Sequence, residues 1–487
     1  MSATTCAVSD RQHPVHTSNA GSLSPAQRRD LALRAITGDQ SVTGLAGENG
    51  VSRKFVYRQA AMASEALNGA FTPCDEDDAV LFNLPITKQW IRQFILAEVL
   101  LGHASFRGVM EISDCLLGCN IALGTVYNVV QDAVAKAREI NSAEDLSLIC
   151  VGAHDEIYQA RRPVLVGACV RSTYCYLLQA EDHCDETTWG VHLLELAERG
   201  LVPDYTIADG GRGLRAGQSA AWSGTPCHSD VFHAERDLGR LALYLDNRAS
   251  GCTAARQKIE RRMRRAKKRG KGQTFSRKLA NVRQAERSAV ALAEEVRILS
   301  DWMRDDILSI AGPSFADRRE LFDFVVEQLR LRESQCPHRI GPVRRKLQNQ
   351  RDGLLAFANL LDGKLAEIAA RFSAPLSLVR EVCELQNLDR TCAAYWMRWT
   401  QLRHGLHRTD YHRIETAVLE AMADTPRASS IVENINSRLR TYFFLRRHIG
   451  NDYLELLRFF LNHHRFLRSE APERRGKSPA ETLTGKP

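Results

Sequence analysis

Apolar residues change their spacing along this chain, and the changes separate helical parts from stranded ones. Over 86–117 they recur every three to four positions, which is typical of amphipathic helices. From Leu146 onward, β-branched and aromatic runs separated by turn residues predict three successive strands, and a helix follows over 186–199. A fourth strand is expected in PDYTIAD (203–209) and a short fifth near HSDVF (228–232). This order predicts an α/β sheet with an antiparallel side.

The region 250–425 carries one helical pattern after another. The following apolar residues fall mostly at three- and four-residue steps, as in a long helical hairpin: Leu279, Val282, Ala289, Leu292, Val296 and Leu299. A strand-poor block of this size within an α/β domain predicts an inserted helical domain. After Thr425-Pro426, the segment SSIVENINSRLRTYFFLRRHIG predicts one more helix, and a basic tail ends the chain.

The N-terminal region has the spacing of a helix-turn-helix. Ser24-Pro25 predicts a helix start, and Asn49-Gly50 a turn before a helix capped by Ser52. The first helix has an apolar face formed by Leu31, Ala32, Ala35 and Ile36, and the short helix before the turn carries Leu45 and Ala46. The last helix would turn Phe55 and Val56 inward and present Arg53, Lys54, Tyr57 and Arg58 to DNA. The alternative is a three-helix bundle with a basic surface.

A second helical region follows, and it ends in a helix for which Gly124-Thr125 is the expected cap. Its apolar residues include Val126, Val129, Val130 and Val134. This region either forms a second DNA-binding unit or only packs against the core.

Composition narrows the class of protein. With 487 residues and 44% hydrophobic content, the chain is too long for one ordinary core and too apolar for disorder, so two to four soluble domains are expected. The formal charge of +8 suggests a polyanionic partner. The 13 cysteines form no C-x-x-C pair and are interpreted as reduced thiols. No signal-peptide core and no long apolar run occur, which predicts a cytoplasmic, nucleoid-associated protein with no membrane partner.

Three acidic residues are the strongest candidates for chemistry. Asp155 and Asp209 each close a predicted strand, and Glu433 lies on the late helix. Carboxylates at the ends of neighbouring strands converge, and Mg²⁺ prefers such oxygen ligands. Two ions held in this way can activate an attacking oxygen and stabilise a leaving one. The three acids therefore predict a site for cutting phosphodiesters.

Each acid also has a plain structural interpretation. Asp209 could be a turn former before glycine, and Glu156 could be the ligand in place of Asp155. Glu433 could complete a capping box with Ser430. The helix favours a functional role, because Glu433 lies opposite an apolar stripe and shares its side with Asn436 and Arg440.

The pattern resembles DDE-type transposases with an RNase H-like core. In that family an Asp lies on the first strand, an Asp follows the fourth, and a Glu lies on a late helix, here within V-E-N-x-N-x-x-L-R. The tail FFLNHHRFLRSEAPERRGKSPAETLTG resembles the segment that closes many bacterial insertion-sequence transposases. Asp230-Val-Phe-His233 is similar to the C/D-x-x-H signature of the Mutator-like and hAT-like groups, which carry a large helical insertion.

The resemblance implies an RNase H-like mixed sheet split by the all-α insertion. Asp155, Asp209 and Glu433 would bind two Mg²⁺ or Mn²⁺ ions, and Asp230 and His233 would support them; the adjacent Cys227-His228 leaves open which pair corresponds. The partners would be double-stranded DNA, as terminal inverted repeats and target DNA, and further copies of the chain in a homodimer or larger synaptic assembly. Two other functions remain open: a transposase-derived DNA-binding regulator without catalysis, and a structure-specific nuclease.

Further DNA contacts are expected outside the acids. The densest positive charge lies in RQKIERRMRRAKKRGKGQTFSRK and supplies six candidates for the DNA backbone: Arg261, Arg262, Arg264, Arg265, Lys267 and Lys268. A solvated helix face is the alternative for this stretch. Arg440 on the late helix is another candidate, and Trp396 and Trp399 either stack on an unpaired base or pack in a core.

These patterns predict seven segments. They are a flexible tail (1–22), a helix-turn-helix domain (23–70), a second helical domain (84–142), the first part of the RNase H-like core (146–245), the helical insertion (246–425), the last core helices with Glu433 (426–470) and a basic tail (471–487).

Overall fold

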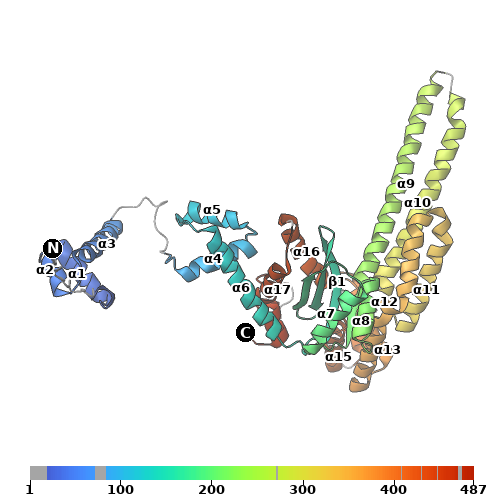
Figure 1. Cartoon of the computed structure of the whole chain (residues 1–487). Coiled ribbons are helices and arrows are strands. Elements are labelled where there is room, and N and C mark those ends of the chain that lie inside the picture. The colour runs from blue at the N-terminus through green and yellow to red at the C-terminus, as the bar shows by residue number, and fades with distance from the viewer. Residues whose placement is uncertain are drawn as a thin grey trace, which may run out of the picture. The chain divides into compact units, whose positions relative to one another are not determined.

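The structure is a computed structural model of the chain. It describes residues 19–71, 84–269, 272–406, 408–428, 430–446, 448–469 and 474–486. Most of the predicted N-terminal tail, residues 270–271 of the predicted insertion and part of the predicted basic tail lie outside these residues. The chain forms two compact units, 1–87 and 88–487 (Figure 1).

The first unit consists of a short 3₁₀ turn and three helices. These are η1 (Asn19–Gly21), α1 (Pro25–Thr37), α2 (Val42–Glu48) and α3 (Arg53–Phe71). Ser24 and Gln27 form a capping box at the start of α1, and Ser52 Oγ accepts the amide of Phe55 at the start of α3. The core contains Leu31, Leu45 and Val56, but Ile36 is 39% exposed, so its predicted place on the apolar face is wrong.

The second unit begins with α4 (Lys88–Leu100), α5 (Phe106–Leu117) and α6 (Leu123–Ala143). Helix α6 starts after Ala122 with no side-chain cap, so the predicted cap at Gly124-Thr125 is wrong: both residues already lie within the first turn. The valines predicted on its apolar face are buried in the same core as the sheet.

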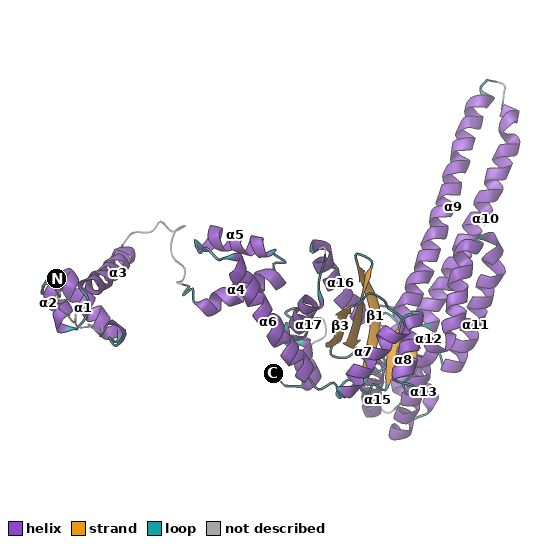
Figure 2. Cartoon of the chain, viewed as in Figure 1, coloured by secondary structure: helices purple, strands orange, loops and turns teal. Residues whose placement is uncertain are grey.

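The described strands lie together in the second unit (Figure 2). They form one five-stranded mixed sheet in the order β3-β2-β1-β4-β5. The strands are β1 (Val151–Gln159), β2 (Arg162–Cys169), β3 (Cys175–Ala180), β4 (Tyr205–Ala208) and β5 (Cys227–Ser229). The pairs β1–β2 and β2–β3 are antiparallel, whereas β1–β4 and β4–β5 are parallel. The predicted mixed α/β class is confirmed at this level, and the order is consistent with an RNase H-like core.

The first strand starts later than its apolar pattern predicts. It begins at Val151, and Asp155 lies in its middle rather than at its end. Asp155 lies in the middle of β1 because the two neighbours of this strand differ in length. It pairs with β2 as far as Gln159, but its parallel partner β4 stops at Ala208, opposite His154. Asp155 therefore lies where the β4 side of the strand becomes free.

Helices cover both faces of the sheet. On one face α7 (Glu186–Glu198) and α8 (Arg212–Ala221) pack through Trp189 and Leu214. On the other, α16 (Ser430–Leu445) and α17 (Asn451–His463) share a core with Ala153 and Ile157 of β1. A short helix, α18 (Pro479–Thr484), follows near the C-terminus.

Between β5 and α16 the described chain is helical. Its elements are α9 (Val231–Lys267), η3 (Gly272–Phe275), α10 (Ser276–Trp302), η4 (Met303–Ile307), α11 (Phe315–Arg332), η5 (Glu333–Gln335), α12 (Pro337–Phe372), α13 (Leu376–Leu385), α14 (Ala393–Gly405) and α15 (Arg408–Ala423). Helices α9 and α10 run side by side as the predicted hairpin (Figure 1). Helix α9 starts directly after β5 and continues into the hairpin, so it links the sheet to the insertion. None of the helices in the described ranges is both long enough and apolar enough to cross a membrane.

Candidate active site

Asp155 and Asp209 lie together because β1 and β4 are parallel neighbours. Strand β4 ends at Ala208, opposite His154, so the next residue on each strand is one of the two acids. The Asp209 carboxylate is fixed by the Gly211 amide, which donates to Oδ1 at 2.7 Å. Asp155, Asp209 and His233 each offer one ligand atom, and these three atoms lie within 4.8 Å of one another.

His233 reaches this site through the Asp-x-x-His spacing. Asp230 follows β5 and caps α9, where its Oδ1 accepts the Phe232 amide at 2.9 Å. Its other oxygen lies 2.5 Å from His233 Nδ1, so one buried carboxylate both starts the helix and orients the imidazole. His228 instead stacks on Tyr205, with 4.4 Å between ring centroids. The structure thus brings Asp230 and His233 to the acids and leaves His228 against Tyr205.

Glu433 lies next to His233 and is held by two arginines. Its Oε1 is 3.7 Å from His233 Nε2 and 3.2 Å from Arg236 Nη1, and its Oε2 is 3.3 Å from Arg440 Nη2. Within the described chain, the group of potential metal ligands contains Asp155, Asp209 and His233 but not Glu433. The arginine predicted to contact DNA from this helix, Arg440, therefore binds Glu433.

Asn436 is a site residue that was not among the predicted ligands. Its Nδ2 donates to Asp155 Oδ2 at 2.7 Å, and its side chain is buried. Its Oδ1 is buried and has no hydrogen-bond partner among the described residues. The signal was present in the sequence, since Asn436 follows Glu433 by three positions and so faces the same way on a helix.

Glu156 lies on the opposite face of β1 from Asp155, as strand alternation requires. Its Oε1 accepts the indole N–H of Trp189 at 2.9 Å, and its Oε2 lies 3.4 Å from the Tyr158 hydroxyl. Because these contacts hold Glu156 against α7, the alternative in which it replaces Asp155 is not favoured by the geometry.

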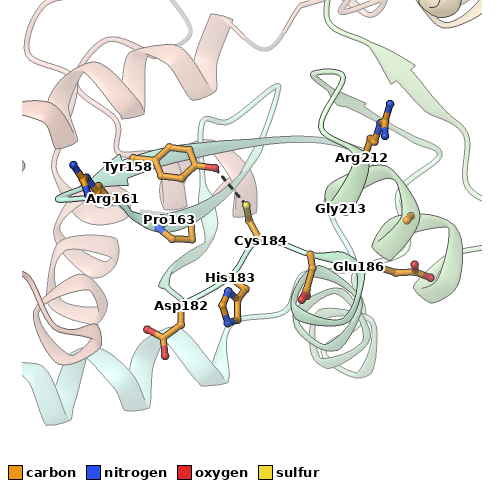
Figure 3. Close-up of a pocket in the computed structure, with 11 residues that line it drawn as sticks. Tyr158, Arg161, Pro163, Asp182, His183, Cys184, Glu186, Arg212 and Gly213 are labelled. Carbon is orange, nitrogen blue, oxygen red and sulfur yellow. Dashed lines mark hydrogen bonds between the residues drawn. The ribbon is translucent and has the colours of Figure 1, made fainter.

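A cavity of about 580 Å³ opens beside Tyr158, between the β1–β2 turn and the start of α8 (Figure 3). The Tyr158 hydroxyl and Cys184 Sγ are 3.3 Å apart on its wall. Its charged residues are of both signs: Arg161 and Arg212, and Asp182, Asp185 and Glu186. This mixture does not single out an anionic or a cationic ligand.

Burial and neighbouring charges shape the electrostatics of the acids. Burial, together with the charges of Asp209 and Glu433, raises the pKa of Asp155 to about 6, although the hydrogen bond from the Glu156 amide and the charge of His233 oppose this change. Burial lowers the pKa of His233, but the hydrogen bond and charge of Asp230 outweigh burial and raise it overall. The site therefore concentrates negative charge in a poorly solvated place, where a cation is favoured.

The residues present fit a divalent cation. Asp155 and Asp209 supply carboxylate oxygens, and Asn436, whose side chain bonds Asp155, carries an Oδ1 that has no partner among the described residues. Oxygen donors of this kind suit Mg²⁺ or Mn²⁺, and His233 adds a nitrogen donor that Mn²⁺ accepts more readily.

The other predicted DNA-contacting residues are exposed on helices of the two units. Arg53, Lys54, Tyr57 and Arg58 are exposed on α3, in the first unit. The six basic candidates of the second unit are exposed along the last turns of α9 and at its C-cap. Trp399 packs against Tyr411, whereas Trp396 is 52% exposed and donates its indole N–H to the Arg390 carbonyl.

Comparisons with known proteins assign no family. No protein-family model matches the chain, and no curated protein matches it. Among solved structures, the chain is similar to one in the Drosophila P element transposase strand transfer complex, with 14% sequence identity and a TM-score of 0.33. That likeness covers 74% of this chain and 100% of the other. This TM-score is too low to assign a fold or a function by similarity.

Proposed function

We propose that this protein is a DNA transposase that cleaves phosphodiesters at the ends of a mobile element and joins them to target DNA with the help of divalent metal ions. The observation that carries the proposal is the convergence of ligand atoms of Asp155, Asp209 and His233 within 4.8 Å, at the point where β4 ends beside β1. An acidic cluster beside free backbone at a strand end suits a phosphodiester better than a small apolar substrate.

In the first step, a water oxygen bonds to phosphorus while the bond to the 3′ oxygen breaks, which leaves a 3′ hydroxyl and a 5′ phosphate. In the second, that hydroxyl attacks a phosphodiester of the target, and the target's own 3′ oxygen departs. Bound Mg²⁺ or Mn²⁺ would supply charge for the attacking and leaving oxygens. Asp155 and Asp209 would hold the ions, and Asn436 fixes the Asp155 carboxylate.

His233 and Glu433 would support the two aspartates. Asp230 orients His233, and Glu433 is held 3.7 Å from its Nε2 by Arg236 and Arg440. We propose that Glu433 turns to the ions once DNA phosphates compete for the two arginines. This movement would complete the three-acid set that the sequence predicts.

The test uses a labelled DNA fragment that spans both flanks of the protein's own gene, with Mg²⁺ or Mn²⁺. Asp155→Asn, Asp209→Asn and Glu433→Gln keep the side-chain shapes and should each lower cleavage by at least about 100-fold. Asp204→Asn is the matched control, because Asp204 precedes β4 and is exposed, whereas Asp209 follows the same strand.

A second measurement does not depend on cleavage. Mn²⁺ binding, followed by the loss of the free-ion electron paramagnetic resonance signal, should weaken in Asp155→Asn and Asp209→Asn but not in Asp204→Asn. Cleavage that survives either of the first two substitutions would remove the proposed site. Flanks that contain no inverted repeats would favour the nuclease or the regulator.

A further inference from the structure

A cleft of about 630 Å³ lies among α16, the end of α17 and the segment that leads to α18. Five residues at 3.6 per turn place Arg438 roughly 140° round α16 from Glu433, so the cleft and the acids lie on different sides of this helix. The lining contains four arginines and a histidine: Arg438, Arg465, Arg468, Arg474 and His464. None of the described lining residues is an acid.

Most of this positive charge is not neutralised within the described protein. Arg465 bonds Glu481 at 2.7 Å, but Arg474 donates only to the uncharged carbonyl of Arg171. The side chains of Arg438 and Arg468 take part in none of the hydrogen bonds or ion pairs of the described residues. Three guanidinium groups in this cleft thus lack a carboxylate partner among the described residues.

Arg438 is the informative member, because it is partly buried as well as unpaired. Burial lowers its pKa. Burial and the charge of Arg438 together lower the pKa of His464 beside it. An unpaired charge that is partly removed from water costs stability, so a ligand that brings negative charge is the natural counterpart.

We propose that this cleft binds the phosphodiester backbone of double-stranded DNA, independently of the catalytic acids. Three unpaired guanidinium groups exceed the charge of a single phosphate, whereas a DNA backbone supplies one negative charge per nucleotide along its length. Guanidinium groups also match phosphate oxygens in geometry. This inference rests on the proposed function only in taking DNA as the substrate, and it gives the protein a second place to hold a duplex while the acids act on another.

The test measures binding of the full chain to a fluorescein-labelled duplex of arbitrary sequence, by anisotropy over a series of salt concentrations. Arg438→Gln/Arg468→Gln should lower affinity about tenfold and flatten the slope of log K against log salt by about 2. The control, Arg304→Gln/Arg330→Gln, removes the same charge from exposed arginines that are paired with acids. Equal loss in both double variants, or none in the first, would overturn the proposal.

Thermal unfolding without DNA separates binding from a structural role. Arg438→Gln should leave the Tm unchanged or raise it, because an unpaired buried charge is removed; a lower Tm with unchanged DNA binding would show that Arg438 only supports the fold. Cleavage assays separate the two proposals. Arginine-dependent duplex binding by a protein that cleaves nothing would remove the transposase and leave the cleft, and the reverse result would remove the cleft alone.

Discussion

Asn436 on α16 donates a hydrogen bond to Asp155 on β1 at 2.7 Å, across 281 positions of sequence. The inserted helices occupy most of the chain between these two residues, so the contact holds together the two halves of the split core. It also fixes one oxygen of an acid whose pKa is raised by burial. The amide thereby favours the charged carboxylate that a metal ion needs.

Asn436→Ala should lower metal-dependent cleavage about 10- to 100-fold, as expected when a residue that orients a metal ligand is lost. DNA binding in the absence of metal should stay the same, since Asn436 is buried and does not line the basic cleft. Single-turnover rates and anisotropy measure the two effects separately. Ser437→Ala, at the next and exposed position of α16, is the control, and an equal loss there would contradict the assignment.

The sequence predicted the parts of the site that depend on local periodicity. Alternation along β1 placed Asp155 on the face of Ala153, and the end of β4 placed Asp209 beside it. The sequence could not show that β1 runs on past Asp155, because that depends on the antiparallel partner β2 and not on the strand itself.

The contacts of Glu433 are another feature that could not be predicted from the sequence. Helical spacing put it on the correct side of α16, but its present partners include Arg236, which lies 197 positions away on α9. A contact between helices so distant in sequence leaves no periodic signal in either of them. The cleft at Arg438 likewise leaves no periodic signal in the sequence. Its arginines come from α16 (Arg438), from the segment after α17 (Arg465 and Arg468) and from the region before α18 (Arg474).

The end of α9 provides a test of how DNA is held without sequence preference. Replacing Arg261, Arg262, Arg264, Arg265, Lys267 and Lys268 by Gln should weaken binding to every duplex. The slope of log K against log salt should fall by up to about 5, because each neutralised phosphate contributes about 0.9. Unchanged salt dependence would mean that this exposed face is only solvated.

The basic residues of α3 provide the corresponding test of sequence preference. Arg53→Ala/Arg58→Ala should reduce the preference for the gene's flanking DNA over a scrambled duplex, by about 1–3 kcal/mol for each residue that reads a base. Competition binding with the two duplexes measures the preference directly. An equal loss for both duplexes would place these arginines on the backbone and not on the bases.

His228 gives the protein a defined response to acid. Burial, together with Arg215, lowers its pKa to about 4, whereas an unfolded histidine titrates near 6.5. Between these values the unfolded chain binds the extra proton, so stability falls as pH drops from about 6.5 to 4 and changes no further below that. His228→Phe keeps a ring against Tyr205 but should remove about 2 kcal/mol of the loss between pH 7.5 and pH 5. Urea unfolding followed by tryptophan fluorescence compares the two proteins, and parallel pH profiles would refute the assignment.

Arg318 in the insertion is fully buried and has no carboxylate partner among the described residues. Its guanidinium group is stabilised by hydrogen bonds to backbone carbonyls. It donates to Pro313 and Ile307 at 2.7 Å and to Ile310 at 3.2 Å, and also to Ser309. Burial lowers the pKa of Arg318 to about 10, so it stays charged at neutral pH. This side chain therefore fixes the turn between η4 and α11.

Arg318→Met should destabilise the insertion by about 3–5 kcal/mol, because it strands several buried carbonyls at once. Amide hydrogen exchange should accelerate first over 303–314, the segment whose carbonyls lose their donor. Arg319→Met, at the neighbouring exposed position, should have little effect. Gly312→Ala offers an independent approach, since a Cβ there would lie 2.7 Å from Arg318 Nη2 and 2.5 Å from the Asp306 carbonyl. If Gly312→Ala loosens the same segment while Arg318→Met does not, the turn depends on its close backbone packing and not on the buried guanidinium.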